Sequence, residues 1–299
     1  MEIDQLKAFL TLARTKNFSK AAETLHLVQS SVSTRIRSLE NTLGRPLFLR
    51  DNRHVELTAA GISLIPYAER ILTLVEEGKE EIGSRTAFED KISIGATDSL
   101  WRHLIKPVLL DFATLYPKYG LFTKTSHSWE VVQFLLDDVI QIGFVYHPPR
   151  LPGVKVLTFY DDEVLLVASR SLPLPKEVIG KDELRRLPFV SLEWDGPLQE
   201  WTKKSMPVGY YPRIQLDQLS MQMDFVLEGK GVAFMPRCTV SEALKKGEIV
   251  SLPLARSIQP PRRKSFVISR VEKRKRPPIE AWFALMHKHG FRLIPYHHK

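Results

Sequence analysis

Three segments at the start of the chain place apolar residues at helical spacing. From Ile3 to Ala13 the apolar side chains recur every three or four residues and predict an amphipathic helix. Ser19 is expected to cap a short second helix, in which small residues permit close packing. Val32, Ile36, Leu39 and Leu43 predict a third helix, whose apolar stripe faces the first two. Gly44 is typical of the residue that ends such a helix.

The opposite face of the third helix carries short polar and cationic side chains, among them Ser30, Thr34, Arg37 and Asn41. A helix that enters the major groove of DNA, about 12 Å wide, requires such a face, because bulky apolar groups would neither fit nor pair there. An ordinary solvated helix face is the alternative interpretation.

Two short strands, over residues 46–50 and 54–57, are predicted to flank a turn at residues 51–53. A helix-turn-helix followed by a hairpin is a winged arrangement. Arg50 and Arg53 are then expected on or beside the wing, where they can reach phosphate or a minor groove.

A long helix is predicted after Thr58, which is a good N-cap residue. Its apolar positions alternate spacings of three and four residues, as in a heptad seam, and its outer positions are charged. The apolar side chains of this seam must be buried against another surface, which is either a second copy of the chain or the chain's own domains. If a second copy buries the seam, the expected dimer contacts are Leu64, Ala68, Ile71 and Val75.

The pattern changes to alternating strands and helices from Lys91 onward. Strands alternating with helices predict parallel sheets with right-handed crossovers, here in two linked lobes with a cleft between them. The first set has strands at 92–96, 121–125 and 141–146 and helices at 100–115 and 130–136. The second set has strands at 163–168, 189–192 and 231–235 and helices at 181–187, 219–227 and 240–246.

The composition adds a charge asymmetry to this picture. The chain has 299 residues, enough for two or three domains, with 43 Lys and Arg against 34 Asp and Glu. The whole excess of 9 positive charges lies in residues 259–299. No apolar run is long enough to span a membrane and no leader pattern opens the chain, which excludes the membrane and secreted classes. The single cysteine, Cys238, excludes an internal disulfide and favours the cytoplasm.

Five motifs of the first part of the chain resemble the amino-terminal domain of LysR-type transcriptional regulators. They are Phe18–Leu25, Gln29–Ser33, Ile36–Glu40, Leu43–Phe48 and Leu57–Gly61. Val28 departs from the family, which usually places a capping Thr or Ser there, so that Gln29 or Ser30 is left to cap the third helix.

The remainder resembles the family's effector-binding half, which is similar to periplasmic solute-binding proteins. Ile92–Gly95, Phe112 with Tyr116 and Pro117, and Phe225–Pro236 carry this likeness, whereas Asp138 and Gln141 depart from the family's Gly and Asp. The implied fold class is α/β with a winged helix-turn-helix head, a long linker helix and a two-lobed effector domain.

The resemblance implies a domain plan. The winged head covers residues 1–58, with the helix-turn-helix at about 18–37, and the linker and dimerisation helix covers 59–88. The first lobe combines residues 91–160 with 265–299, which adds a strand at 265–271 and a helix at 279–289, and the second lobe covers 161–264.

The resemblance also implies a sequence-specific DNA-binding regulator that responds to a small effector held between the lobes. Its partners are double-stranded promoter DNA, an effector of anionic character, further copies of the chain in a dimer or dimer of dimers, and RNA polymerase as a candidate. The expected DNA-binding residues are Ser19, Gln29, Ser30, Ser33, Thr34, Arg35, Arg37, Arg50 and Arg53. The expected effector-binding residues are Thr97, Asp98, Ser99, Arg102, Ser126, His127, Ser128, Trp129 and Trp194.

Two structural arguments support the effector residues, and one opposes them. Turns that follow parallel strands collect at the carboxyl edge of the sheet, where hydroxyls and free N–H groups favour small anions. Asp98 opposes an anion unless Arg102 or His103 faces the ligand. Serine and threonine at strand ends are also common as simple helix caps.

No enzyme motif, cofactor or metal site is expected. The chain lacks a nucleophile elbow, a phosphate-binding P-loop and a zinc-protease motif, and Cys238 is expected to be an inert apolar residue. His287 with His289, and His297 with His298, are interpreted as parts of a solvated basic tail rather than as metal ligands. The alternative function is a cytoplasmic solute-binding or catalytic α/β protein with an accessory helix-turn-helix interaction module.

Overall fold

The computed structural model describes residues 1–50, 55–84, 88–173, 177–194, 196–206, 211–271 and 276–296. The chain divides into two units, Met1–Ala87 and Phe88–Lys299. Each unit is described by itself.

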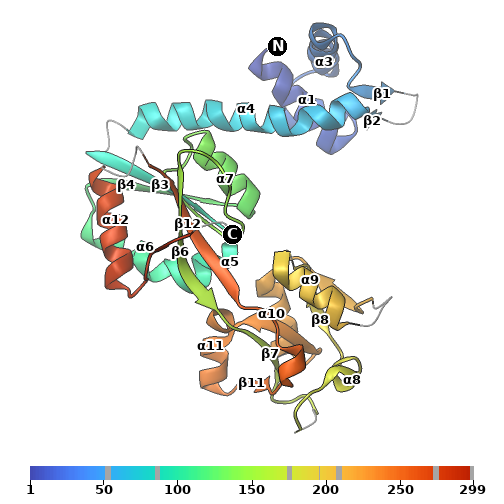
Figure 1. The fold of residues 1–299 in the computed structure, drawn as a ribbon. Coiled ribbons are helices and arrows are strands. Elements are labelled where there is room, and N and C mark those ends of the chain that lie inside the picture. The colour runs from blue at the N-terminus through green and yellow to red at the C-terminus, as the bar shows by residue number, and fades with distance from the viewer. Residues whose placement is uncertain are drawn as a thin grey trace. The chain divides into compact units, whose positions relative to one another are not determined.

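The first unit is a winged helical head that continues into a long helix (Figure 1). It contains the three predicted helices α1 (Ile3–Thr15), α2 (Phe18–Thr24) and α3 (Gln29–Leu43), then the antiparallel strands β1 (Phe48–Arg50) and β2 (Val55–Leu57), and finally α4 (Ala59–Ser84). Val32, Ile36 and Leu39 are fully buried, as their spacing predicts. Leu43, predicted in the same stripe, is exposed because it lies in the last turn of α3, beyond the buried part of the stripe.

The helix caps of the head differ from the sequence prediction at two places. Asn17, not Ser19, caps α2, since the Asn17 side chain accepts the N–H of Lys20 at 3.0 Å and Ser19 already lies inside the helix. Val28 occupies the N-cap of α3 without a side-chain bond, so neither Gln29 nor Ser30 supplies the missing cap. Gly44 ends α3 at a φ of 65°, in the left-handed region that glycine favours.

Hydrogen bonds fix the wing and the start of α4 to the head. The carboxylate of Glu40 accepts the N–H groups of Leu47 and Phe48, at 2.9 and 3.3 Å. Thr58 caps α4 as predicted, with its hydroxyl accepting the N–H of Gly61 at 3.0 Å. Gly61 is required by close packing, because a Cβ atom there would lie 2.3 Å from the carbonyl oxygen of Leu47.

The predicted dimer seam of α4 is largely occupied within the chain itself. Ala68 is fully buried in the core of the head, and Leu64 and Ile71 pack partly against the same core. The assignment of Ala68 to a dimer contact is therefore wrong, because it keeps no surface for a partner. The large apolar side chains that α4 leaves exposed are Ile62, Tyr67, Leu74 and Ile82.

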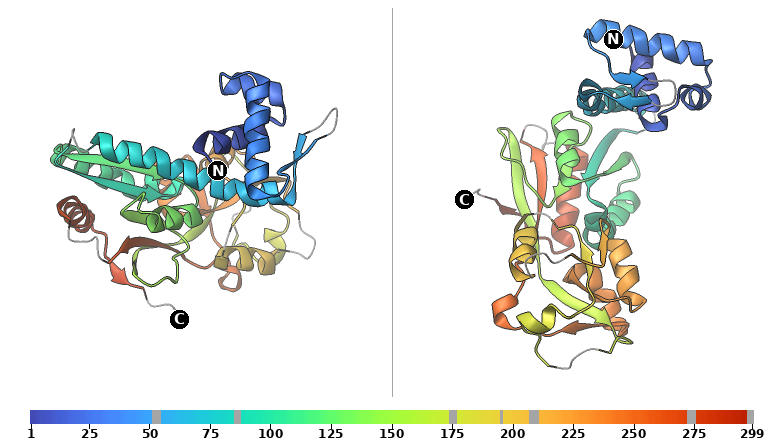
Figure 2. Two further views of the ribbon diagram at one scale, coloured as in Figure 1. Left: turned by 90° about the horizontal axis from the view of Figure 1, so that it is seen from above. Right: turned by 90° about the vertical axis from the view of Figure 1, so that its right-hand side faces the viewer.

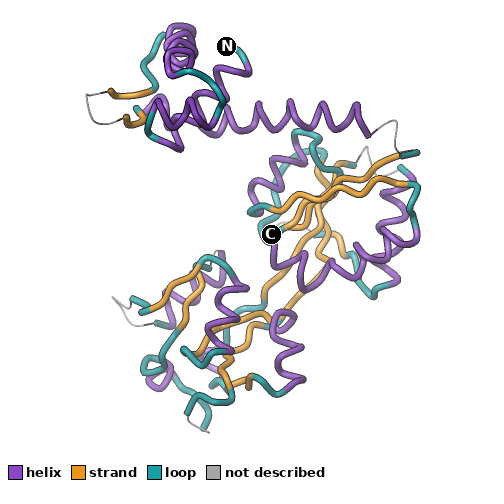
Figure 3. Tube along the Cα trace, turned by 180° about the vertical axis from the view of Figure 1, so that it is seen from behind, coloured by secondary structure: helices purple, strands orange, loops and turns teal. Residues whose placement is uncertain are grey.

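The first lobe of the second unit is a six-stranded sheet covered by helices on both faces (Figures 1 and 3). Its strand order is β13-β6-β12-β5-β3-β4. The strands are β3 (Asp90–Ala96), β4 (Tyr119–Thr125), β5 (Ile142–Val145), β6 (Val154–Asp162), β12 (Arg263–Arg270) and β13 (Ile294–Pro295). The helices are α5 (Asp98–Leu100), a π-helical turn at Trp101–Ile105, α6 (Lys106–Leu115), α7 (Ser128–Leu136) and α12 (Pro277–Lys288).

Each face of this sheet has its own apolar core. Helices α6 and α12 pack on one face (Figure 2). Phe112, Phe144 and Trp282 are fully buried there. Helix α7 packs on the other face, where Val131 and Ile268 are fully buried. This arrangement explains why β3 from Ile92 to Ala96 and the whole of β5 are buried continuously, rather than at every second residue.

The second lobe is built on smaller sheets. An antiparallel sheet has the order β10-β7-β11, and β8 pairs with β9 in parallel. Its strands are β7 (Val164–Ser169), β8 (Val190–Leu192), β9 (Ile214–Leu216), β10 (Val232–Pro236) and β11 (Ile249–Leu252). Its helices are α8 (Lys181–Leu184), α9 (Gly196–Ser205), α10 (Leu219–Leu227), α11 (Arg237–Lys246) and a 3-10 turn at Arg256–Ile258.

The predicted parallel pairing is confirmed for the three strands of the first set and is wrong for β7 and β10 of the second set. Strands β4, β3 and β5 are parallel, but β12 runs antiparallel to β5 and β6, and the β10-β7-β11 sheet is antiparallel throughout. Local spacing cannot reveal that β6 and β12 pair side by side, since paired residues such as Asp162 and Arg263 are 101 positions apart in the sequence. Strands β6, β9, β11 and β13 and helix α9 are absent from the sequence prediction.

Candidate DNA-binding face and effector site

Helix α3 presents a small polar face to solvent. Gln29, Ser30, Thr34 and Arg37 are exposed, and Ser33 is half-buried. Thr34 donates to the carbonyl of Ser30 at 2.9 Å, a local bond that keeps its side chain close to the helix. Arg37 forms no ion pair within the described part of the chain, so its guanidinium is available to an external anion.

Two other predicted DNA-binding residues are engaged within the head. Arg35 is half-buried and pairs with Asp4 at 2.9 Å, which ties α3 to α1. Ser19 donates to the side-chain oxygen of Gln29 at 3.2 Å, so it links α2 to the start of α3. The amide group of Gln29 retains its two N–H donors for an external acceptor. The side chain of Arg50 and the whole of Arg53 lie outside the described residues.

The two predicted effector turns lie together at one edge of the first lobe's sheet. Residues 97–99 follow β3 and residues 126–129 follow β4, and these strands pair in parallel with Ala96 opposite Thr125. Ser126 donates its N–H to the carbonyl of Ala96 at 3.2 Å. The expectation that both turns meet at the carboxyl edge is therefore confirmed.

Tyr146, at the end of β5, connects the two turns. Its hydroxyl lies 2.9 Å from that of Ser99, and its backbone N–H donates to the hydroxyl of Ser128 at 3.1 Å. Thr97 occupies the N-cap position of α5 without capping it, and its buried hydroxyl has no hydrogen-bond partner among the described residues. The helix-cap alternative thus fails for Thr97.

Arg263 connects this edge to the second lobe. The guanidinium carbon lies 3.5 Å from the ring centre of Tyr146 in the first lobe and 4.8 Å from that of Trp194 in the second. Trp194 is buried and packs in the core of its own lobe. Neither Tyr146 nor Arg263 was among the predicted site residues. Arg263 precedes the expected strand 265–271 by two residues, and nothing local sets it apart from Arg262.

Family models match both halves of the chain. The model of the bacterial regulatory helix-turn-helix protein, lysR family, matches residues 3–62, and that of the LysR substrate binding domain matches residues 86–290. The HTH-type transcriptional regulator HdfR of Yersinia pestis (strain Pestoides F) is 31% identical over 239 residues, which are 79% of this chain and 81% of that protein. The chain belongs to the LysR family of transcriptional regulators.

Solved structures have the same fold over nearly the whole length. The crystal structure of CbnR, a LysR family transcriptional regulator, has a TM-score of 0.67 at 22% identity and covers 96% of this chain and 99% of that one. A Vibrio fischeri DarR structure in complex with DNA has a TM-score of 0.58 at 23% identity and covers 96% of this chain and 98% of that one. A third structure, full-length CbnR with its target DNA, has a TM-score of 0.64 at 24% identity and covers 97% and 99%.

Family membership confirms the predicted fold class and the predicted function. This LysR-family chain is a DNA-binding transcription regulator with a two-lobed effector-binding domain, and its family consists of regulators rather than enzymes. The alternative of a solute-binding or catalytic protein with an accessory module is thereby replaced.

Several predicted effector residues of this regulator have structural partners of their own. Ser126 donates to the carboxylate of Glu130, which also accepts the N–H of His127 at 3.3 Å, so both residues belong to the cap of α7. Asp98 holds Arg102 in an exposed ion pair at 2.9 Å. Trp129 is largely exposed.

Neither cation that was expected to favour an anion near these turns is available for that role. The charge of Arg102 is neutralised by Asp98. Burial, with a smaller contribution from the Arg102 charge, lowers the pKa of His103 below its ordinary value, which favours the neutral imidazole. Burial raises the pKa of Cys238 to about 12, so the thiol stays protonated and unreactive, as the sequence predicts.

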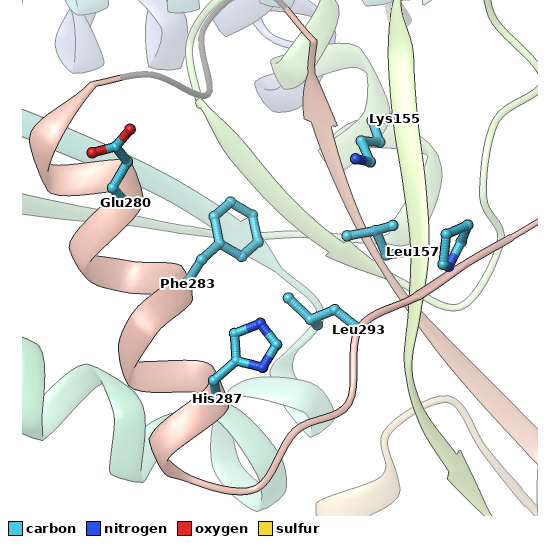
Figure 4. A pocket seen from close by; sticks show the side chains of 7 residues that line it. Lys155, Leu157, Glu280, Phe283, His287 and Leu293 are labelled. Atoms are coloured by element: carbon cyan, nitrogen blue, oxygen red, sulfur yellow. The ribbon is translucent and has the colours of Figure 1, made fainter.

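A surface depression lies elsewhere on the first lobe (Figure 4). It has a volume of about 460 Å³, and Phe283 and His287 of α12 line it together with Leu157 of β6 and Leu293. None of the predicted effector residues lines it. Within the described ranges, no helix is long and apolar enough to cross a membrane, and no group of three or more His, Cys, Asp or Glu is placed to hold a metal ion.

Proposed function

We propose that this regulator binds operator DNA through the exposed face of α3 and releases or rearranges on that DNA when a small effector binds at the junction of its two lobes. The observation that carries the DNA part is the division of α3 into a buried apolar face and an exposed polar one. Gln29, Ser30, Ser33 and Thr34 contact base edges in this proposal.

Arg37 contacts phosphate in the same proposal, whereas Arg35 serves the head's internal structure through Asp4. Ser19 acts by orienting Gln29. Arg50 and Arg53 remain proposed phosphate contacts from the wing, on the grounds of sequence position alone.

The test of the DNA face is a mobility-shift titration at several salt concentrations, with DNA from upstream of the regulator's own gene. Arg37→Ala should weaken binding to all sequences and reduce the salt slope by about 1. Arg35→Ala is the matched control and should leave the slope unchanged. An Arg37→Ala variant with unaltered affinity and slope would contradict the placement.

Sequence preference is tested by two threonines of α3 that make the same bond to the carbonyl four residues earlier, each at 2.9 Å. Thr34 lies on the proposed DNA face and Thr42 does not. Thr34→Ala should change which base pairs are preferred, by about 1–3 kcal/mol at the contacted position, and Thr42→Ala should not. Equal effects of the two substitutions would remove Thr34 from the contact surface.

The effector site is proposed at Thr97, Ser99 and Ser128, with Tyr146 holding the turns together. The unpartnered buried hydroxyl of Thr97 supports this site, because a buried hydroxyl without a partner costs about 1–3 kcal/mol and a bound ligand would satisfy it. The other predicted residues are placed around this site rather than in it. They are Asp98 and Arg102, which pair with each other, Ser126 and His127, which belong to the cap of α7, the exposed Trp129, and Trp194 of the second lobe.

A thermal-shift screen of small carboxylates tests the site. A Thr97→Val, Ser128→Ala double variant should lose the stabilisation that a carboxylate gives the wild type. Thr114→Val is the control, since that threonine is exposed on α6 and bonds only to the carbonyl of Leu110. Equal stabilisation by the same compound in wild type and double variant would move the site elsewhere.

The dimer contact of α4 is proposed on the side that the head leaves exposed. Tyr67 and Leu74 are seven residues apart and Ile82 follows eight residues later, so they share a stripe, with Val75 beside it. A dimer, or a dimer of dimers, presents paired heads to a two-fold related operator. The cytoplasm is the proposed location, where promoter DNA and RNA polymerase are available.

A further inference from the structure

Arg263 differs from three other arginines of this unit in its electrostatic partners. Arg237 pairs with Glu163 at 2.7 Å, Arg262 pairs with Asp161 at 3.0 Å, and Arg102 pairs with Asp98 at 2.9 Å. Arg263 forms no ion pair within the described part of the chain. No carboxylate of the described residues therefore neutralises the charge of Arg263 within contact distance.

The buried carboxylate of Asp162, on the strand that pairs with β12, does not neutralise Arg263 either. Asp162 lies opposite Arg263 in the pairing of β6 with β12, but it accepts the backbone N–H of Cys238 at 3.0 Å and makes no ion pair with Arg263. Both groups are held by backbone pairing at the point where the long strands pass from one lobe to the other (Figure 1).

The rings of Tyr146 and Trp194 contact Arg263 at its planar guanidinium group. At 3.5 Å from the ring centre of Tyr146, the planar group lies against the face of the ring, and Trp194 is close by at 4.8 Å. Stacking of this kind leaves the N–H groups at the edge of the guanidinium free. That edge is the fork that binds a carboxylate or phosphate through two parallel hydrogen bonds.

The same contacts place Arg263 beside the proposed effector turns. The Tyr146 ring that stacks on Arg263 carries the hydroxyl bonded to Ser99, which lies in the same turn as the unpartnered Thr97. Tyr146 therefore contacts both the turn at residues 97–99, through its hydroxyl, and the guanidinium of Arg263, through its ring.

We propose that Arg263 is the anion-binding residue of the effector site, and that the effector is a small molecule with a planar or tetrahedral oxyanion. This inference rests on the effector site proposed above. It assigns the ligand class: the oxyanion pairs with the Arg263 fork and accepts from the hydroxyls of the 97–99 turn. Because Tyr146 and Trp194 come from different lobes, occupancy of Arg263 also couples the ligand to the junction between them.

The test is calorimetric titration of the full-length protein with acetate, succinate, benzoate and inorganic phosphate as probes. At least one probe should bind the wild type, and Arg263→Gln should lower the affinity for that probe by tenfold or more. Arg263→Lys keeps the charge but loses the planar fork and the stacking, so it should lower the affinity for that probe by an intermediate factor. Lys264→Gln is the control, because it removes one exposed charge from the next position of the same strand and should leave affinity unchanged.

Arg263→Lys also separates binding from folding, because it retains a long cationic side chain if Arg263→Gln fails to fold. Unchanged affinity in both Arg263 variants, or no binding of any probe by the wild type, would overturn the inference. Mobility shifts on operator DNA without a probe keep the two proposals distinct. If the protein binds DNA but no anion, the proposed DNA binding stands and only the Arg263 assignment falls. If it binds an anion through Arg263 but no DNA, the Arg263 assignment stands and the proposed DNA binding falls.

Discussion

The head and the effector-binding unit use their candidate site residues in different ways. On α3 the residues proposed to contact DNA lie on the exposed face, while Val32, Ile36 and Leu39 on the opposite face form the core. In the effector unit the hydroxyls of Ser99 and Ser128 bond to Tyr146 and thereby join α5, α7 and β5. The head separates recognition from folding, whereas the effector site is made of groups that also connect its elements.

This difference has a consequence for mutation. Substitutions on the outer face of α3 should change DNA binding with little effect on stability, since surface positions outside special features change it by less than about 0.5 kcal/mol. Substitutions in the effector turns should change both properties together. Stability measurements therefore sharpen the comparison, and α4 offers the strongest contrast because it has a buried and an exposed side.

The largest effect is expected at Ala68, which is fully buried in the head. Ala68→Asp should destabilise the head by several kcal/mol, because it buries an unpaired carboxylate. Leu74→Asp, on the exposed side of the same helix, should leave the head folded and shift the oligomer toward monomer. Urea unfolding and sedimentation would measure the two outcomes, and an intact dimer in Leu74→Asp would place the dimer contact elsewhere.

A smaller effect is expected from two glycines of α4. A Cβ at Gly61 would lie 2.3 Å from the carbonyl oxygen of Leu47, whereas a Cβ at Gly78 meets nothing within 4 Å. Gly61→Ala should lower the free energy of unfolding by about 1–3 kcal/mol through forced displacement of the wing. Gly78→Ala should raise it by up to about 1 kcal/mol, as alanine favours helix. Denaturation curves with equal shifts would contradict the close packing of α4 on the wing.

The effector unit is tested by removing one hydroxyl. Tyr146→Phe deletes the bond to Ser99 and should lower the free energy of unfolding by about 0.5–1.5 kcal/mol. Tyr160→Phe is the control, because the Tyr160 hydroxyl makes no hydrogen bond within the described residues, and it should have a smaller effect. If Tyr146→Phe proved neutral, Tyr146 would not be holding the effector turns together.

The smallest effect is expected from the pH dependence of His103. Because its pKa is lowered in the folded state, the unfolded chain binds the proton more readily, and stability is lost as pH falls through the ordinary value of 6.5. His103→Gln should therefore reduce the difference in unfolding free energy between pH 7 and pH 5. The same difference in variant and wild type would show that burial of His103 carries no stability cost.

The head was predicted well because its signals are local. The spacing of apolar residues located all three helices and the long α4, and Thr58 and Gly44 marked their ends correctly. The errors there concern competition between neighbours. Asn17 and Ser19 are both good capping residues, and only the backbone path shows that the helix begins before Ser19.

The effector unit was predicted less completely for a physical reason. The parallel core of β4, β3 and β5 has apolar strands alternating with helices, and the turns at Thr97 and Ser126 follow directly from that pattern. The pairing of β6 with β12 joins segments far apart in sequence, and no local pattern encodes it. Arg263 was missed because the pairing of β12 with β5 and β6 places it beside Tyr146. Tyr146 was missed because its bonds join it to Ser99 and Ser128, which lie 47 and 18 residues away.

The sequence alone determined the winged head, the long helix, the α/β character of the second unit, the family and the polar face of α3. These features depend on helical or strand periodicity and on ordered motifs, which are properties of neighbouring residues. Tertiary structure decided which side of α4 faces the head, which serine and threonine hydroxyls are already bonded, and which arginine at the junction is unpaired. Those properties depend on contacts between residues distant in sequence, because a side chain is used or left free by its neighbours in space.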